Sequence, residues 1–356
     1  MQNDFFKLRN AIVAKVTSTL KPNEATKSTT EVVPTQNIEA YKLYRKARDL
    51  WSTRGEAEMK QSIELFKQAI EMDPGFVEAY CGLGDAYAMM IPYRYVPPDQ
   101  VRETIQLAED VFFKAIKINP NYSGAYPAMG WLECMAKHRY EKALEHFDEA
   151  LKHNPNNIQA LMWKAITCRS IKRSNEAIQL SSRAIELDPN NHVAYMLLSL
   201  DYASDAQYEN AEKAAKKSVS LKPDYGMGQN ALFNVLAMQE NKKEELKKHI
   251  ESLEALSNKD WNIEQTIFIY HYYFGTEESF SNAADYLKKK AELTNYDLKG
   301  YPLYFFCTGQ KEMGYKFLEE GVKNGSISLM GAHRYNIEWN VIKDEERYKS
   351  IYGDNY

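Results

Sequence analysis

The sequence lacks the features that mark several large classes of protein. Its 356 residues contain no stretch approaching the ~18 consecutive apolar residues of a membrane-spanning helix. It has no basic surplus, with 45 Lys and Arg against 49 Asp and Glu, whereas a dedicated nucleic-acid binder usually carries one. The opening residues, MQNDFFKLRN, lack the apolar core of a signal peptide. These absences predict a cytoplasmic protein that binds neither membrane nor nucleic acid directly.

Residues that carry chemistry are few and scattered. The four cysteines form no C-x-x-C pair, which is typical of buried, reduced thiols rather than of a disulfide framework. The seven histidines show no H-x-x-x-H or H-E-x-x-H spacing, and neither G-x-S-x-G nor G-x-x-x-x-G-K-[ST] occurs. The GLGDAY stretch at residues 82–87 is expected inside a helix, where Gly84 is a packing position. We therefore predict no enzyme activity, no catalytic residue, no metal and no cofactor.

One pattern recurs along the chain. Five segments end alike: KQAIEMDP, FKAIKINP, DEALKHNP, SRAIELDP and KKSVSLKP. Their prolines stand at positions 74, 120, 155, 189 and 223, so the intervals are 46, 35, 34 and 34 residues. A period near 34 with fixed small-residue and proline positions is typical of the tetratricopeptide repeat, a helix–turn–helix unit.

Each recurring position has a physical role in such a unit. Five residues before each proline, and again seven residues further back, stands a small side chain that lets neighbouring helices approach closely. These residues are Ala69, Ala115, Ala150, Ala184 and Ser218, and then Ser62, Ala108, Ala143, Ala177 and Ala211. Between them Phe66, Phe112 and Phe147 fill the space between paired helices, whereas Ser181 and Ala215 replace the aromatic ring later. The pattern predicts an all-α fold, a right-handed superhelical solenoid of antiparallel helix pairs.

Departures from the 34-residue period define the expected domains. Residues 38–257 hold repeats 1–6, with a proline-bearing loop insertion at residues 89–100. Residues 258–356 are expected to form degenerate helix pairs and a closing segment, and residues 21–37 are polar and typical of a linker. Residues 1–20 are expected to form an amphipathic helix whose apolar face carries Phe5, Leu8, Ile12, Val13, Val16 and Leu20.

Both ends of the chain resemble one bacterial group. IEAYKLYRKARDLWSTR, at residues 38–54, is similar to an opening helix of the form EAYxLYLKGRxxW, and the insertion falls where that group has one. GQKEMGYKFLEEGVKNGSISLM, at residues 309–330, is similar to the group's closing helix pair. NVIKDEERYKSI, at residues 340–351, is similar to its terminal DDPRFxxL, although Glu346 replaces the proline and Tyr348 the phenylalanine.

The chain thus resembles the C-terminal tetratricopeptide half of TolB-like signalling regulators. In that group the repeats are joined to a winged-helix DNA-binding domain, a nucleotide cyclase or a kinase. The resemblance implies that residues 1–20 are the last helix of an upstream TolB-like domain and that the chain is an excised fragment. The alternative is a natural N-terminal helix that packs on the first repeat.

Solenoids of this kind usually bind partners on their concave surface, which first helices line. In the repeat register the lining residues are Cys81, Asp85, Trp131, Met135, Met162, Ile166, Arg169, Met196, Leu200, Met227, Asn230 and Asn234. Arg169, Asn230 and Asn234 are able to hydrogen-bond a carboxylate or a peptide backbone. The others form a methionine-rich apolar strip suited to an apolar helix or an extended peptide. The alternatives are that these residues pack the interior or are covered by the chain's own N-terminal helix.

The sequence therefore predicts a non-catalytic protein–protein interaction module. Its leading interpretation is the sensor or interaction half of a bacterial regulator, which binds a protein or peptide in an apolar groove. Two alternatives stay open. One is an independent scaffold or assembly chaperone, and the other is an accessory module of a cyclase or kinase whose catalytic domain lies outside this chain.

Overall fold

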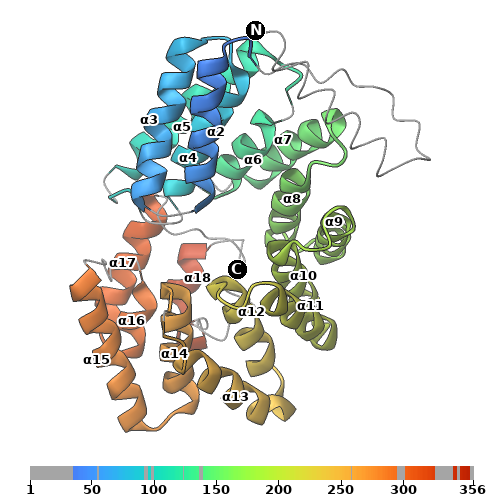
Figure 1. The fold of residues 1–356 in the computed structure, drawn as a ribbon. Coiled ribbons are helices and arrows are strands. Elements are labelled where there is room, and N and C mark those ends of the chain that lie inside the picture. Colours follow the sequence, from blue (N-terminus) through green and yellow to red (C-terminus); the bar gives the residue numbers. More distant parts are fainter. Residues whose placement is uncertain are drawn as a thin grey trace. The chain divides into compact units, whose positions relative to one another are not determined.

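The fold was analysed in a computed structural model that describes residues 35–53, 56–91, 95–97, 100–122, 124–135, 139–257, 259–294, 301–324, 340–342 and 345–352. These ranges contain 17 α-helices, one short 3₁₀ helix and no strand, which confirms the all-α prediction (Figure 1). No helix in the described ranges is both long and apolar enough to cross a membrane. The amphipathic helix predicted for residues 1–20 lies outside them.

The chain divides into two compact units. The first comprises Met1–Val96 and Glu103–Ala128, and the second comprises Pro97–Arg102 and Met129–Tyr356. The helices of the first unit are α2 (Ile38–Thr53), α3 (Glu56–Met72), α4 (Val77–Met90) and α5 (Val101–Ile118), followed by the start of α6 (Ala125–Met135). Helix α5 begins at Val101, several residues before the position near Gln106 at which the sequence register resumes it.

The second unit continues as a series of helix pairs. Its helices are α7 (Tyr140–His153), α8 (Ile158–Ser170), α9 (Ser174–Leu187), α10 (His192–Ser204), α11 (Tyr208–Leu221), α12 (Gly226–Ala237), η1 (Glu240–Lys242), α13 (Lys243–Glu254), α14 (Trp261–Phe274), α15 (Glu277–Thr294), α16 (Pro302–Cys307), α17 (Lys311–Asn324) and α18 (Glu346–Tyr352). Neighbours in the sequence pack on one another, as α8 does on α9 and α10 on α11.

The turns between repeats are encoded by short polar motifs. Pro155 follows the end of α7, and two residues later the Asn157 side chain accepts a hydrogen bond from the Ala160 amide, which caps α8. Pro189 and Asn191 repeat this arrangement before α10. The turn tolerates a proline because no backbone N–H is needed at that position. The asparagine side chain accepts a hydrogen bond from a backbone N–H of the next helix that has no partner within the helix.

The small positions are buried as the repeat register predicts. All ten of the alanines and serines named for these positions have no exposed surface. The aromatic positions are equally buried, and a glycine lies opposite each of the three rings. A Cβ atom added at Gly84 would lie 2.5 Å from the Phe112 ring, and one at Gly130 would lie 2.6 Å from the Phe147 ring. The helices therefore approach closely because the aromatic ring of one helix packs against a glycine of its partner.

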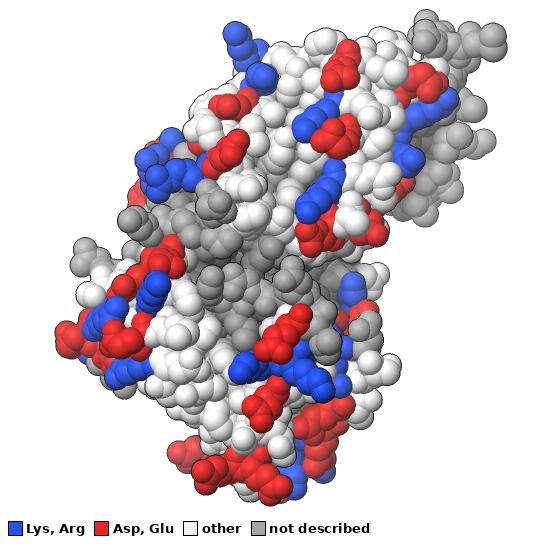
Figure 2. Space-filling view, turned by 90° about the vertical axis from the view of Figure 1, so that its left-hand side faces the viewer, with Lys and Arg blue, Asp and Glu red and all other residues white. Residues whose placement is uncertain are grey.

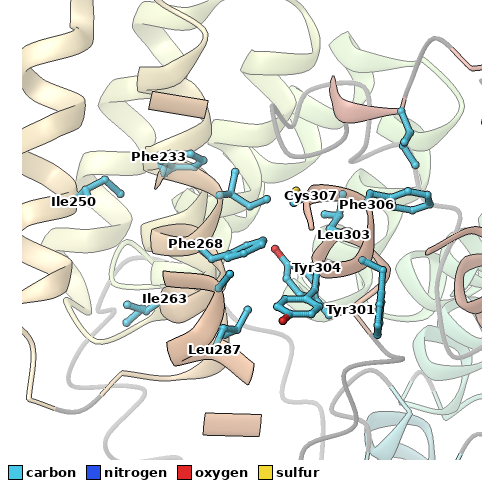
Figure 3. Packing of buried hydrophobic residues seen from close by; sticks show 14 of the residues in the cluster. Phe233, Ile250, Ile263, Phe268, Leu287, Tyr301, Leu303, Tyr304, Phe306 and Cys307 are labelled. Carbon is cyan, nitrogen blue, oxygen red and sulfur yellow. The ribbon is translucent and has the colours of Figure 1, made fainter. Parts of the chain in front are cut away.

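The C-terminal helices share the largest apolar core in the described part of the chain. It runs from α11 to α18 and is rich in aromatic residues (Figure 3). Phe268 of α14 lies at its centre, with its ring centroid 5.8 Å from that of Tyr304 and 5.6 Å from that of Phe280. Gly309, with a φ of 78°, forms the tight turn from α16 to α17. The closing helix adds Tyr348, which is 2% exposed.

Candidate partner-binding surface

In the first unit the two predicted lining residues, both on α4, are largely buried. Cys81 packs beside Val77, Ala115 and Ala125, and burial raises the pKa of its thiol well above the usual range. Asp85 lies 3.4 Å from the guanidinium of Arg48, across the contact between α2 and α4. These side chains offer little surface to a partner.

In the second unit two tryptophans stack on neighbouring first helices. Trp131 of α6 and Trp163 of α8 have ring centroids 5.1 Å apart and planes inclined by 26°, and both are half-buried. The repeat register predicts Trp131 but omits Trp163, which stands one residue after the predicted Met162. An aromatic pair with an exposed edge is the kind of feature that anchors a bound partner.

An apolar surface continues from the tryptophans across α8, α10 and α12. Met162, Ile166 and Leu200 are half-buried and pack with Tyr225 around a small buried cluster that includes Met196. The structure therefore brings four of the predicted lining residues together on α8 and α10. We define the apolar strip as Trp131, Met162, Trp163, Ile166, Leu200 and Tyr225.

Arg169 does not face this strip with a free charge. Its guanidinium lies 2.5 Å from Asp201 Oδ1, and the Arg169 and Asp201 side chains are 6% and 0% exposed. The Ser181 hydroxyl donates to the other carboxylate oxygen of Asp201, also at 2.5 Å. Burial raises the pKa of Asp201, while Arg169 and Ser181 act in the opposite direction. The role predicted for Arg169 is thus replaced by an internal ion pair at the repeat whose aromatic residue is missing.

The remaining predicted residues are divided between packing and exposure. Asn234 donates to the backbone and side-chain oxygens of Asn230, at 2.9 and 3.0 Å, and Asn230 donates to Thr266 Oγ1 at 3.0 Å. Met227 is 49% exposed. The backbone of Met135 ends α6, but its side chain lies outside the described structure. The two asparagines thus link α12 to α14.

One cluster has the composition of a hydrolase triad. His271 Nε2 lies 2.8 Å from Glu254 Oε1, and His271 Nδ1 lies 3.1 Å from Ser279 Oγ. However, the Ser279 hydroxyl also accepts from the Thr276 amide at 2.9 Å, and Thr276 Oγ1 accepts from the Ser279 amide at 3.1 Å. These reciprocal hydrogen bonds form a capping box at the N-terminus of α15, so the Ser279 hydroxyl serves to cap this helix.

Charged side chains and possible metal ligands are scattered among the described residues. Lys and Arg alternate with Asp and Glu over the face shown in Figure 2, where no large area carries one sign. In the ranges that the structure describes, no group of three or more His, Cys, Asp and Glu is placed to hold a metal ion. His333 lies outside those ranges.

Comparisons with known proteins agree with the repeat. Residues 135–200 match a family model described as a tetratricopeptide repeat. Human tetratricopeptide repeat protein 6 is 30% identical over 111 residues, which are 31% of this chain and 19% of that protein. The match therefore spans about a fifth of that relative's length.

Two solved structures share the fold at low sequence identity. PilW, titled a widely conserved type IV pilus biogenesis factor, is 16% identical with a TM-score of 0.51, covering 65% of this chain and 99% of PilW. The human IFIT1 dimer with m7Gppp-AAAA is 13% identical with a TM-score of 0.56, covering 80% of this chain and 72% of IFIT1. Residues 135–200 thus match a tetratricopeptide repeat, and the paired helices of the chain are similar in fold to proteins built from such helix pairs.

Proposed function

We propose that this protein is a non-catalytic scaffold that binds a protein or peptide partner on the apolar strip. The observation that supports the proposal is the stacked, half-buried pair Trp131 and Trp163, which continues into Met162, Ile166 and Leu200. Apolar side chains that stay partly exposed on successive helices gain from desolvation when a partner covers them.

The chemistry of the strip favours an apolar partner segment. The Arg169 guanidinium is buried against Asp201, so it does not reach the surface to bind a ligand carboxylate. Packed helices lie about 8–10 Å apart, and side chains seven residues apart on a bound helix lie about 10.5 Å apart. A partner helix with apolar residues at that spacing is able to place one side chain over each first helix.

The test begins with a library of amphipathic 15-residue peptides, from which the tightest binder serves as the probe. Trp131→Ala is expected to weaken its binding by about 2 kcal/mol, or roughly 30-fold, because buried aromatic anchors dominate interface energy. Met313→Ala, at an exposed site on α17, is the control and is expected to leave affinity unchanged. Titration calorimetry measures both.

Salt distinguishes this mode of binding from a carboxylate clamp. Affinity at the strip is expected to stay nearly constant between low and high salt, whereas a charged clamp weakens through screening. A peptide that binds equally well to wild type and to the Trp131→Ala, Met162→Ala, Leu200→Ala triple variant would contradict the proposal.

The biological setting that we propose is the interaction half of a cytoplasmic bacterial regulator. The similarity of residues 38–54 and 309–351 to regulators with TolB-like domains supports it. Sequencing the reading frame upstream of Met1 tests this setting. An in-frame TolB-like, DNA-binding or cyclase sequence is expected. A stop codon directly upstream would favour the independent scaffold or chaperone instead.

A further inference from the structure

The first helix pair has an apolar face on the side away from the next repeat. Helix α4 packs on the other side, where Arg48 pairs with Asp85 and the Phe66 ring meets Gly82. With about 100° per residue, Leu43 and Leu50 of α2 are turned roughly 140° and 160° away from Arg48. Leu65 and Met72 of α3 are turned roughly 100° and 120° away from Phe66 by the same arithmetic. The three leucines are half-buried and Met72 is 50% exposed.

These four residues form one patch, which we call the end face. Helices α2 and α3 pack side by side (Figure 1). Leu43 and Leu50 are seven residues apart, as are Leu65 and Met72, so each pair spans about 10.5 Å along its helix. The terminal repeats of a solenoid normally need a polar outer face or a cap. The end face is not polar, so it calls for a cap.

The chain enters the first unit beside this patch. Thr35 is 4% exposed and its hydroxyl donates to Asp73, while Asn37 Nδ2 donates to the Met72 carbonyl at 3.0 Å. Residue 35 is therefore fixed at the end of α3, next to Met72. The 14 residues from 21 to 34 have a typical end-to-end distance of about 20 Å. Helix α2 is about 24 Å long, so this linker is able to reach all of the end face.

The segment beyond the linker has the matching pattern. Its predicted apolar face contains Phe5 and Ile12, and also Val13 and Leu20, each pair again seven residues apart. We propose that residues 5–20 of this chain dock as a helix on the end face and cap the first repeat. The apolar strip of the second unit then remains available to an external partner.

Hydrogen exchange of the full chain, followed by mass spectrometry, tests the segment. In wild type the amides of residues 8–20 are expected to exchange at least tenfold more slowly than in the Ile12→Asp, Val16→Asp variant. Ser18→Asp, on the predicted polar face, is the matched control and is expected to keep the slow exchange. Fast exchange of these amides in wild type would overturn the proposal.

A second set of variants tests the surface. Met72→Asp, at a half-exposed position, is expected to release the segment while the amides of α4 and α5 stay protected. Glu64→Ala, on another face of α3, is the control. The proposal fails if protection survives Met72→Asp but is lost in the Trp131→Ala, Met162→Ala variant, because the segment then occupies the strip. It also fails if protection depends on protein concentration, because a second copy then supplies the segment.

Discussion

At the scale of single residues, the repeat is held together by matched sizes. Phe112 and Phe147 each face a glycine ten residues after the preceding proline, at Gly84 and Gly130. In the next two repeats the ring positions are Ser181 and Ala215, and the glycine positions become Ala165 and Ser199. All four of these are buried. Where a smaller side chain replaces the ring on one helix, a larger side chain replaces the glycine on the facing helix. This exchange partly restores the packed volume, as close packing requires.

Gly130→Ala tests this matching. In an exposed helix the change would stabilise the protein by about 1 kcal/mol. Here the new methyl group meets the Phe147 ring, so we expect a net loss of about 1–3 kcal/mol in the free energy of unfolding by urea. Combining it with Phe147→Leu is expected to cost less than the sum of the two single changes. Additive costs would show that the ring and the glycine do not constrain each other.

At the scale of helices, one repeat replaces its aromatic core with an ion pair. Arg169 of α8, Ser181 of α9 and Asp201 of α10 meet where the three preceding repeats place a ring. A buried pair of this kind is costly to break because the surviving charge stays buried without a partner. The pair therefore ties three helices to a single arrangement.

Asp201→Ala and Arg169→Ala are each expected to lower the free energy of unfolding by about 3–5 kcal/mol. The double variant is expected to cost less than the two single losses together, because it leaves no uncompensated charge. Urea unfolding of all three measures this coupling. Glu186→Ala removes an exposed pair with Arg183 and is the control, with an expected change below about 1 kcal/mol. A fully additive double variant would disprove the coupling.

A second group of charges links α11, η1 and α13 at the surface. Lys242 and Lys216 hydrogen-bond to Glu245 at 2.8 and 3.0 Å and lower the pKa of its carboxyl to about 2. A depressed folded-state pKa contributes stability above the unfolded value of about 4.5, and this contribution is lost as the pH falls towards 2. Glu245→Gln is therefore expected to flatten the pH dependence of thermal stability in that window. Glu244→Gln, on the same helix, is the control and should leave the slope unchanged.

At the scale of the whole molecule, repeat physics explains what the sequence predicts and what it misses. Helix pairs, buried alanines and aromatic positions follow from local spacing, so they are predicted correctly through Pro223. The ion pair of Arg169 is harder to predict from the sequence, because its partner Asp201 lies 32 residues away and only the fold brings them together. Two signals point to it, Ser181 at an aromatic position and an acidic residue among the apolar positions of α10. Met196 is predicted to line the concave surface, with interior packing as the alternative, and neighbouring helices leave it 3% exposed.

The whole chain is also expected to be chemically inert. Ser279 is held in a helix cap, and His271 is shared between Ser279 and Glu254. A fluorophosphonate probe should therefore leave the purified protein unlabelled, and elemental analysis after dialysis should find no stoichiometric zinc. Labelling that disappears in Ser279→Ala would show a working nucleophile. Retained zinc would direct attention to His271 and His333.

The buried pair between Arg169 and Asp201 also limits how this gene is able to evolve. Arrays of near-identical repeats lengthen and shorten by unequal recombination, because any unit fits beside any other. Here the loss of one unit, residues 156–189, would remove Arg169 and Ser181 but keep Asp201, which would leave a buried carboxylate without its cation. Duplicating the same unit would instead add a second arginine without an aspartate. The unit that carries Arg169 is therefore not interchangeable with the other repeats of this protein.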